Sequence, residues 1–192
     1  MLGLCYSLGD GVKTDKAEMI KWYRLSAEQG NAGAQGMMGY HYWNGYDIAQ
    51  DYDEAAKWLR KAADQDDTDA QKLLGDCYVN GQGVPQSNLE ATKWYKLVAE
   101  KGDSYIAWVV ARSYQIGEGV KQDFQQAYKY YYLAANNALD DYEINSNTES
   151  MEEMQKKLTK AQISKIDAEV KLIQARIDKA NARYDDYDDF DD

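Results

Sequence analysis

Few residues in this chain have the types and spacing that chemistry requires. The only histidine is His41, and histidine is the side chain that most often acts as a general base or metal ligand near neutral pH. It would need partners, and the sequence has no H-E-x-x-H, C-x-x-C or serine nucleophile-elbow motif to supply them. We therefore expect no catalytic residue, no metal site and no cofactor, and we predict that the protein is not an enzyme.

Acidic and cysteine pairs lead to the same expectation. Glu152 and Glu153 could pair as acid and base, but the chain carries 33 acidic residues, so adjacent carboxylates are expected by chance. Cys5 and Cys77 occupy equivalent positions two repeats apart, which separates them by on the order of 20 Å. Because a disulfide needs Cα atoms within about 7 Å, we expect both cysteines to be unpaired and partly buried.

The sequence repeats with a period of 36 residues. Each copy has a large aromatic residue, at Trp22, Trp58, Trp94 and Tyr130, and a tyrosine, at Tyr6, Tyr42, Tyr78 and Tyr114. A fixed period of this length indicates stacked helix-turn-helix units, each too small to bury its apolar face without a neighbour.

Glycines and side-chain oxygens mark the ends of the two helices in each copy. Motifs such as Gly81-Gln-Gly-Val84 follow the first helix, where glycine adopts positive φ without strain. They recur with the period and follow a helix rather than a strand, so we interpret them as turns and not as phosphate-binding loops. The second helix starts at an N-cap residue, which is Asp15, Asp51, Ser87 or Asp123.

The combined pattern, A-Q-x-x-L-G-x-x-Y-x-x-G-x-G-V-x-x-D-x-x-x-A-x-x-W-Y-x-x-A-A-x-x-G, resembles the Sel-1-like repeat, a relative of the tetratricopeptide repeat. The resemblance implies an all-α fold, a right-handed α/α superhelical solenoid. Four copies are expected at about residues 1–30, 31–66, 67–102 and 103–138. Some positions depart from the pattern: the second copy has Tyr46-Asp47-Ile48 in its turn, and the fourth has Tyr130 in place of tryptophan.

The C-terminal part resembles the cap of that family. Residues 158–163 read L-T-K-A-Q-I, which implies a capping helix pair within residues 139–184. Thr159 and Gln162 can form a capping box, so the last helix is expected from about Thr159 to Tyr184. Its apolar residues alternate by three and four like a coiled-coil seam. The helix either seals its own solenoid or, from about Val170, pairs weakly with another protein or a second copy through Val170, Ile173, Ile177 and Tyr184.

Charge restricts the partners. The net charge is −11 and the pI about 4.6, which argues against nucleic acid, whose phosphates would be repelled. Residues 185–192 form an acidic tail that we expect to be disordered. It is either a solvated end or a docking peptide that anchors Tyr187 and Phe190 on a basic partner.

Positions that vary between copies are the candidates for partner recognition. The short first helices of such solenoids line the concave face, and aromatic residues and arginine are enriched at binding hot spots. Trp43 and Trp108 have no aromatic counterparts in the other copies, so they either contact a partner or fill gaps between helices. The predicted partner-binding residues are Tyr40, Trp43, Asn44, Asp76, Asn80, Trp108, Arg112 and Gln115.

The resemblance implies a protein-protein interaction scaffold or adaptor, typical of bacteria, with another protein as its partner. An immunity protein that neutralises a secreted toxin is a narrower alternative, and a small-molecule binder or enzyme using the groove is a different one. No run of about 20 apolar residues could span a bilayer, and no signal-peptide pattern is present. Localisation stays open between the cytoplasm and, if an upstream export signal has been removed, the periplasm.

Overall fold

The computed structural model describes residues 13–188, with side-chain environments through residue 182. Within that range the chain is all-α, as the repeat pattern predicts, and the turns and loops between helices contain no strand. The helices are α2 (Lys16–Glu28), α3 (Ala32–Asn44), α4 (Tyr52–Ala63), α5 (Thr68–Asn80), α6 (Asn88–Ala99), α7 (Ser104–Ile116), α8 (Phe124–Asn137), α9 (Asp141–Gln155) and α10 (Lys160–Asp188). Residues of the first copy before Lys13, Cys5 among them, lie outside the described part.

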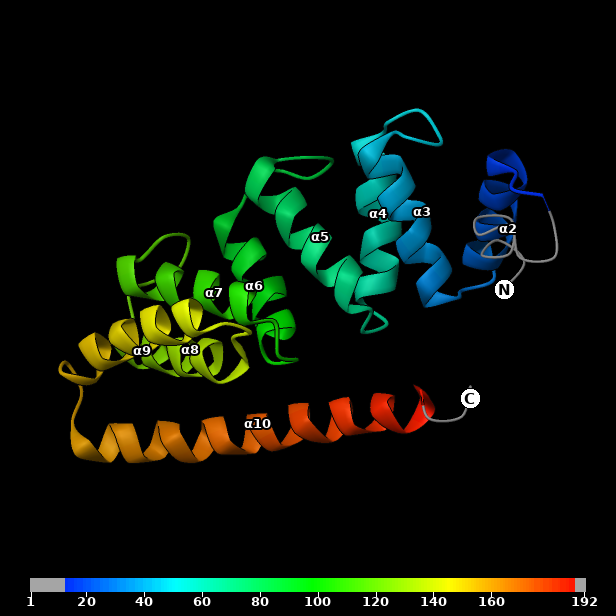
Figure 1. The fold of residues 1–192 in the computed structure, drawn as a ribbon. Coiled ribbons are helices and arrows are strands. Elements are labelled where there is room, and N and C mark those ends of the chain that lie inside the picture. The colour runs from blue at the N-terminus through cyan, green and yellow to red at the C-terminus, as the bar shows by residue number, and fades with distance from the viewer. Residues whose placement is uncertain (1–12, 189–192) are drawn as a thin grey trace. The chain divides into compact units, whose positions relative to one another are not determined.

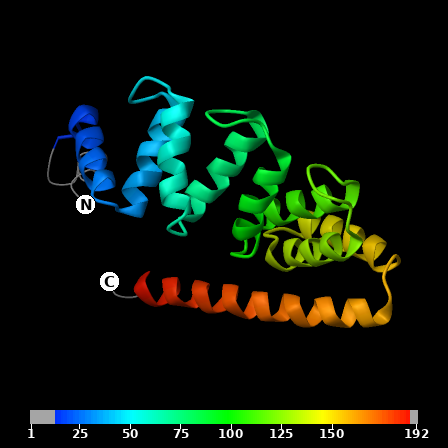
Figure 2. The same ribbon diagram turned by 180° about the vertical axis from the view of Figure 1, so that it is seen from behind.

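The chain forms two compact units, Met1–Trp94 and Tyr95–Asp192, which we call unit 1 and unit 2. Most helices pack beside their neighbours in sequence, and α10 instead packs on α8. In unit 1, α3 lies between α2 and α4, and in unit 2, α8 lies between α7 and α9 (Figures 1 and 2). This pairing of neighbours is what a helix-turn-helix repeat requires.

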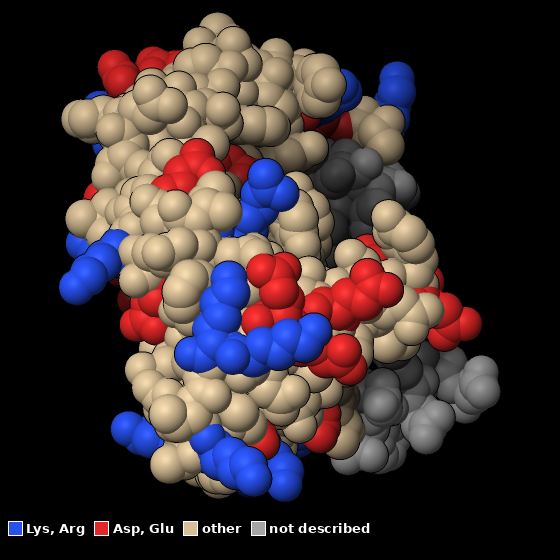
Figure 3. Space-filling view, turned by 90° about the vertical axis from the view of Figure 1, so that its left-hand side faces the viewer, with Lys and Arg blue, Asp and Glu red and all other residues tan. Residues whose placement is uncertain are grey.

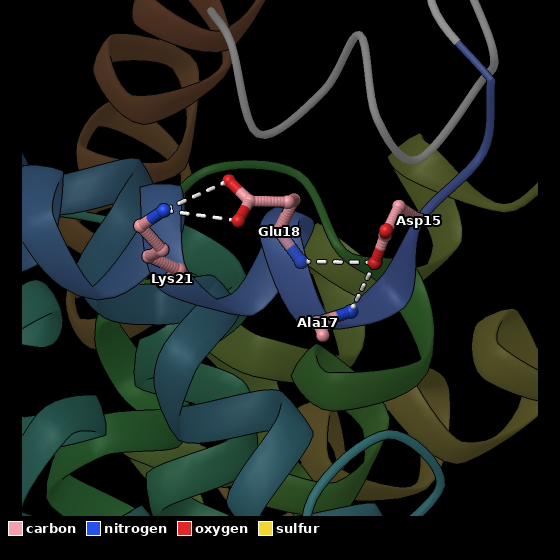
Figure 4. A network of polar contacts seen from close by, with 4 residues as sticks. All are labelled: Asp15, Ala17, Glu18 and Lys21. Atoms are coloured by element: carbon pink, nitrogen blue, oxygen red, sulfur yellow. Dashed lines mark hydrogen bonds and ion pairs between the residues drawn. The ribbon is translucent and has the colours of Figure 1, made fainter.

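The predicted N-caps are present. Asp15 Oδ1 accepts hydrogen bonds from the backbone N–H groups of Ala17 and Glu18 at 2.9 and 3.1 Å (Figure 4). Asp51 and Asp123 cap α4 and α8 in the same way, and Ser87 Oγ accepts from the N–H of Glu90. One turn into α2, Lys21 Nζ pairs with Glu18 Oε1 at 2.9 Å.

The turn glycines have the backbone conformation that the motif predicts. Gly45, Gly81 and Gly117 end α3, α5 and α7 with φ of 72°, 67° and 78°. At Gly83, a Cβ atom would lie 1.8 Å from the carbonyl oxygen of Tyr52. The second glycine of the motif is therefore needed because the turn packs directly on the start of α4.

Trp58 fills the space between the first two layers. It is 9% exposed and joins a buried cluster with Met19 and Ile20 of α2 and Ala34 and Met38 of α3. The neighbouring cluster contains Cys77, which is free and fully buried, and burial raises the pKa of its thiol to about 12. A thiol in this state is inert toward nucleophilic chemistry.

The long C-terminal helix packs on its own unit. Thr159 and Gln162 form the expected capping box, in which the Thr159 N–H donates to Gln162 Oε1 at 2.8 Å and the Gln162 N–H donates to Thr159 Oγ1 at 3.3 Å. Val170, Ile173 and Ile177 are 0%, 3% and 3% exposed. Because α10 buries these three residues within unit 2, the structure favours the alternative in which the helix seals its own solenoid, and pairing with another chain stays a prediction. α10 continues through Asp188, four residues past its expected end and into the tail for which the sequence predicts disorder. The side chain of Tyr184 and the residues after Asp188 lie outside the described part.

A buried lysine joins α10 to the fourth repeat. Lys129 of α8 is 6% exposed, and its Nζ lies 2.7 Å from Glu169 Oε1 of α10 and 3.1 Å from Glu100 Oε1. The equivalent lysines of the earlier copies pair instead with a glutamate three residues before them. The fourth copy has Gln126 at that glutamate position, so Lys129 is available to hold the last helix.

Candidate partner-binding groove

Unit 1 contains a groove of about 1130 Å³ bordered by α2, α3 and α5. Its apolar wall comes from all three helices, and it includes Leu25, Met37 and Leu73. Carboxylates and one lysine lie along its α5 side. The lining residues are Trp22, Tyr23, Leu25, Ser26, Gln29, Asn31, Gly33, Ala34, Gly36, Met37, Tyr40, Leu59, Asp67, Asp69, Ala70, Lys72, Leu73 and Asp76.

The groove is hollow at α3 because two positions there carry no side chain. A Cβ atom at Gly33 would meet only Asn31 Oδ1, at 3.7 Å, and one at Gly36 would meet the Asp67 carboxylate at 3.4 Å. Neither glycine has positive φ, and neither is required by a close backbone approach. Both cost helix stability relative to alanine, and what they provide is open space beside Tyr40.

The repeat positions of Gly33, Gly36 and Tyr40 carry different side chains in the first helices of the next two copies. On α5 they are Asp69, Lys72 and Asp76, which also line the groove. On α7 of unit 2 they are Tyr105, Trp108 and Arg112.

On α7 the three side chains form one stack. The rings of Tyr105 and Trp108 lie 6.2 Å apart at 24°, and Arg112 Cζ lies 5.6 Å from the Trp108 ring. The first two of these positions thus lack side chains on α3, are charged on α5 and are aromatic on α7.

The structure divides the residues predicted from sequence. Tyr40 and Asp76 line the groove of unit 1. Trp43 packs against the buried cluster of α4 and α5, and its Nε1 donates to Gln82 Oε1 at 3.1 Å, which favours the gap-filling interpretation.

Three further predicted residues make local hydrogen bonds. Asn44 Oδ1 accepts from the N–H of Tyr46, Asn80 Nδ2 donates to the carbonyl of Asp76, and Gln115 Oε1 accepts from the Tyr131 hydroxyl. Gln115 belongs to unit 2, as do Trp108 and Arg112.

Several groove residues were not identified from sequence, chiefly Gly33, Gly36, Asp69 and Lys72. The signal was present in the register, since these positions align with Tyr105 and Trp108. In a repeat, a helix surface that lacks side chains is as distinctive as one that carries unusual side chains.

His41 lies behind the groove wall rather than in it. It is 5% exposed, and its Nδ1 is 3.0 Å from Asp47 Oδ2, while Asp47 Oδ1 is 2.7 Å from Lys16 Nζ. Burial is the main cause that lowers the pKa of His41, against the opposing effect of Asp47. Among the described residues no group of three or more His, Cys, Asp or Glu could hold a metal ion. The His41–Asp47 pair, in which Asp47 replaces a turn glycine, is best understood as local packing.

The stacked helix pairs, their wedge aromatics and the variable stripe on the first helices define a helical-repeat protein of the kind that presents a surface to a partner. The Sel1 repeat model matches residues 1–31, 32–67, 68–103 and 107–139. The chain therefore belongs to the Sel1 repeat family, as its motif predicts. Members of this family generally serve as non-catalytic interaction scaffolds.

Solved structures agree with this assignment. A Sel1 repeat protein from Oxalobacter formigenes is 37% identical with a TM-score of 0.63, over 74% of this chain and 58% of that one. A protective antigen of uropathogenic Escherichia coli with an SLR fold is 30% identical with a TM-score of 0.68, over 96% of this chain and 39% of that one.

A more distant structure, cysteine-rich protein B of Helicobacter pylori, shares the fold at 20% identity and a TM-score of 0.50, over 71% of this chain and 98% of that one. No curated protein matches the chain significantly. In the part of the chain that the structure describes, no helix is long and apolar enough to cross a membrane.

Proposed function

We propose that this chain is an interaction scaffold that binds a segment of another protein in the groove of unit 1. The observation that carries the proposal is the pair Gly33 and Gly36, which leaves the groove open where α7 has Tyr105 and Trp108. Glycines in a helix interior reduce stability by about 0.5–1 kcal/mol each relative to alanine. Space that is kept at such a cost is typical of a site that something else fills.

The lining favours a protein segment over a small metabolite. Small-molecule sites occupy about 300–1,000 Å³ and direct a few polar groups at one point. This groove of about 1130 Å³ has its charged groups along α5 and further polar groups at Ser26, Gln29 and Asn31. Leu25, Met37 and Tyr40 are 46%, 36% and 45% exposed along it. Apolar side chains aligned in this way suit a peptide or helix laid along the groove.

The proposal applies to an adaptor and to an immunity protein alike, since either would present this groove to another protein. Co-expression with a toxin encoded nearby would separate the two, because only an immunity protein would restore growth.

The test fills the groove from within. Gly36→Trp places in α3 the residue that α7 carries at the same repeat position, so the repeat accommodates it, and Gly36→Ala adds only a methyl group. For a partner recovered by pull-down with the intact chain, we expect Gly36→Trp to reduce affinity by about 30-fold or more, equivalent to about 2 kcal/mol. Gly36→Ala should bind nearly as the parent does.

Circular dichroism would establish that both variants keep their helix content, and titration calorimetry would give the affinities. Equal affinity of the Gly36→Trp variant and the parent would show that the partner binds elsewhere.

A further inference from the structure

We infer that the groove of unit 1 selects a segment in which a bulky apolar residue stands beside a lysine or arginine. This inference rests on the proposed function and adds the chemistry of the partner. It follows from how the Gly36 hollow and the Asp67 carboxylate are placed relative to each other.

The apolar half of the site is the hollow at α3. A side chain entering over Gly33 and Gly36 would reach space bordered by Met37, Tyr40 and Leu73. The side chains of Met37 and Tyr40 are 36% and 45% exposed. An anchor side chain bound there would remove their apolar surface from water. Burial of a large aliphatic or aromatic side chain is the main source of affinity at such a point.

The charged half lies directly next to the hollow. Both carboxylate oxygens of Asp67 are within 3.5 Å of the point where a Gly36 Cβ would be, and Oδ2 is the nearer at 3.4 Å. Asp67 Oδ1 caps α5 by accepting from the N–H of Ala70 at 2.9 Å. The face of this carboxylate toward the hollow can therefore accept from a cation that enters with the anchor, and charge-assisted hydrogen bonds are the stronger kind.

The remaining charges on the groove are mostly negative. Asp69 and Asp76 join Asp67 along α5, against the single Lys72. The N-terminus of α5 contributes about half a positive charge. The three carboxylates outweigh this charge and the charge of Lys72 together. An acidic peptide would be repelled, and a neutral one would partly desolvate the face of the Asp67 carboxylate toward the hollow without supplying a counter-charge.

The probe for the test is a displayed library of random 12-residue peptides. It is selected on the intact chain and counter-selected on the Gly36→Trp variant, so that groove binders are retained. Enriched peptides are synthesised and titrated against the parent chain, Asp67→Asn and Asp69→Asn. Asparagine is as good an N-cap as aspartate, so Asp67→Asn removes the charge and keeps the cap of α5.

Asp103→Asn is the matched control, because Asp103 caps α7 of unit 2 at the same repeat position. We expect lysine or arginine enriched next to tryptophan, phenylalanine or leucine. Affinity should fall about tenfold or more with Asp67→Asn, as for loss of a charged hydrogen bond, and be unchanged with Asp103→Asn.

Two outcomes would overturn the inference in distinguishable ways. Peptides that depend on the open Gly36 position but carry no basic residue, and bind Asp67→Asn as well as the parent, would refute the charge selection while leaving the proposed groove intact. Peptides that bind the parent and the Gly36→Trp variant equally would refute the groove itself.

Discussion

At the scale of single residues, Glu100 is the group whose charge state most directly affects unit 2. Burial raises its pKa, but the hydrogen bond and positive charge of Lys129, together with the Tyr130 hydroxyl, outweigh burial and hold the pKa below the ordinary 4.5. Lys129 shows the matching effect: burial lowers its pKa, but the hydrogen bonds that it donates to the Glu169 and Glu100 carboxylates more than compensate, so the pKa is raised.

These shifts predict a pH dependence of stability. Because the pKa of Glu100 is lower in the folded state, its contribution is complete above about pH 4.5 and is lost as pH falls through the folded value. The free energy of unfolding of Glu100→Gln should therefore lie below that of the parent at pH 7, and the difference should narrow as the pH falls below 4.5. Urea denaturation across this range measures it.

Glu90→Gln is the control, since Glu90 pairs with the exposed Lys93 on the surface and such pairs contribute little. If the difference in free energy of unfolding between Glu100→Gln and the parent stays constant with pH, the ion pair with Lys129 is not the cause of that difference.

At the scale of elements, α10 is a cap that unit 2 needs. Adjacent residues on it provide a matched pair: Ile173 is 3% exposed and Leu172 is 70% exposed. Ile173→Asp should lower the free energy of unfolding by about 3 kcal/mol or more, because it buries a carboxylate without a partner and removes apolar packing. Leu172→Asp should change it by no more than about 0.5 kcal/mol.

Chemical denaturation followed by circular dichroism would compare the two variants. Similar small effects of both would mean that the seam of α10 is not an intramolecular contact, and would restore pairing with another chain as its role.

Local signals made much of this predictable. N-caps such as Asp51 and turn glycines such as Gly81 act within a few residues of their position, so a single sequence reveals them, and the period reveals Trp58. The sequence could not show which surface packs on Val170 and Ile173. An apolar seam indicates that some surface covers it but does not identify that surface. The hollow at Gly36 depends on three helices at once, and no local pattern encodes that.

At the scale of the whole molecule, Figure 3 shows the charges on one face. Lysines and arginines lie next to aspartates and glutamates there, in several small groups of each sign. Although the chain carries a net −11, selectivity on such a surface depends on local charges like those of the groove. The long-range field would serve mainly to speed the approach of a basic partner.

A repeat stack also predicts how damage spreads. Trp58→Ala should cost about 3–5 kcal/mol, the usual range for a buried tryptophan, and amide hydrogen exchange should accelerate in α2 and α3 as well as in α4. The reason is that the side chain joins a cluster built by all three helices.

Tyr105→Ala, at a site that is 61% exposed, should leave exchange in unit 1 unchanged. An unchanged melting temperature for Trp58→Ala would contradict the layered packing.

The ionic link between Lys129 and Glu169 also fixes the order of the copies. In the second and third repeats the equivalent lysine is already engaged by Glu54 or Glu90. If recombination brought α10 against either of these, Glu169 would meet a lysine that already pairs with a glutamate on its own helix, whereas Lys129 has Gln126 at that position. The copies share one shape but are not interchangeable, and the terminal position is reserved for the copy that has Gln126. Growth or shortening of such an array by duplication is therefore tolerated between its internal members and opposed at its end.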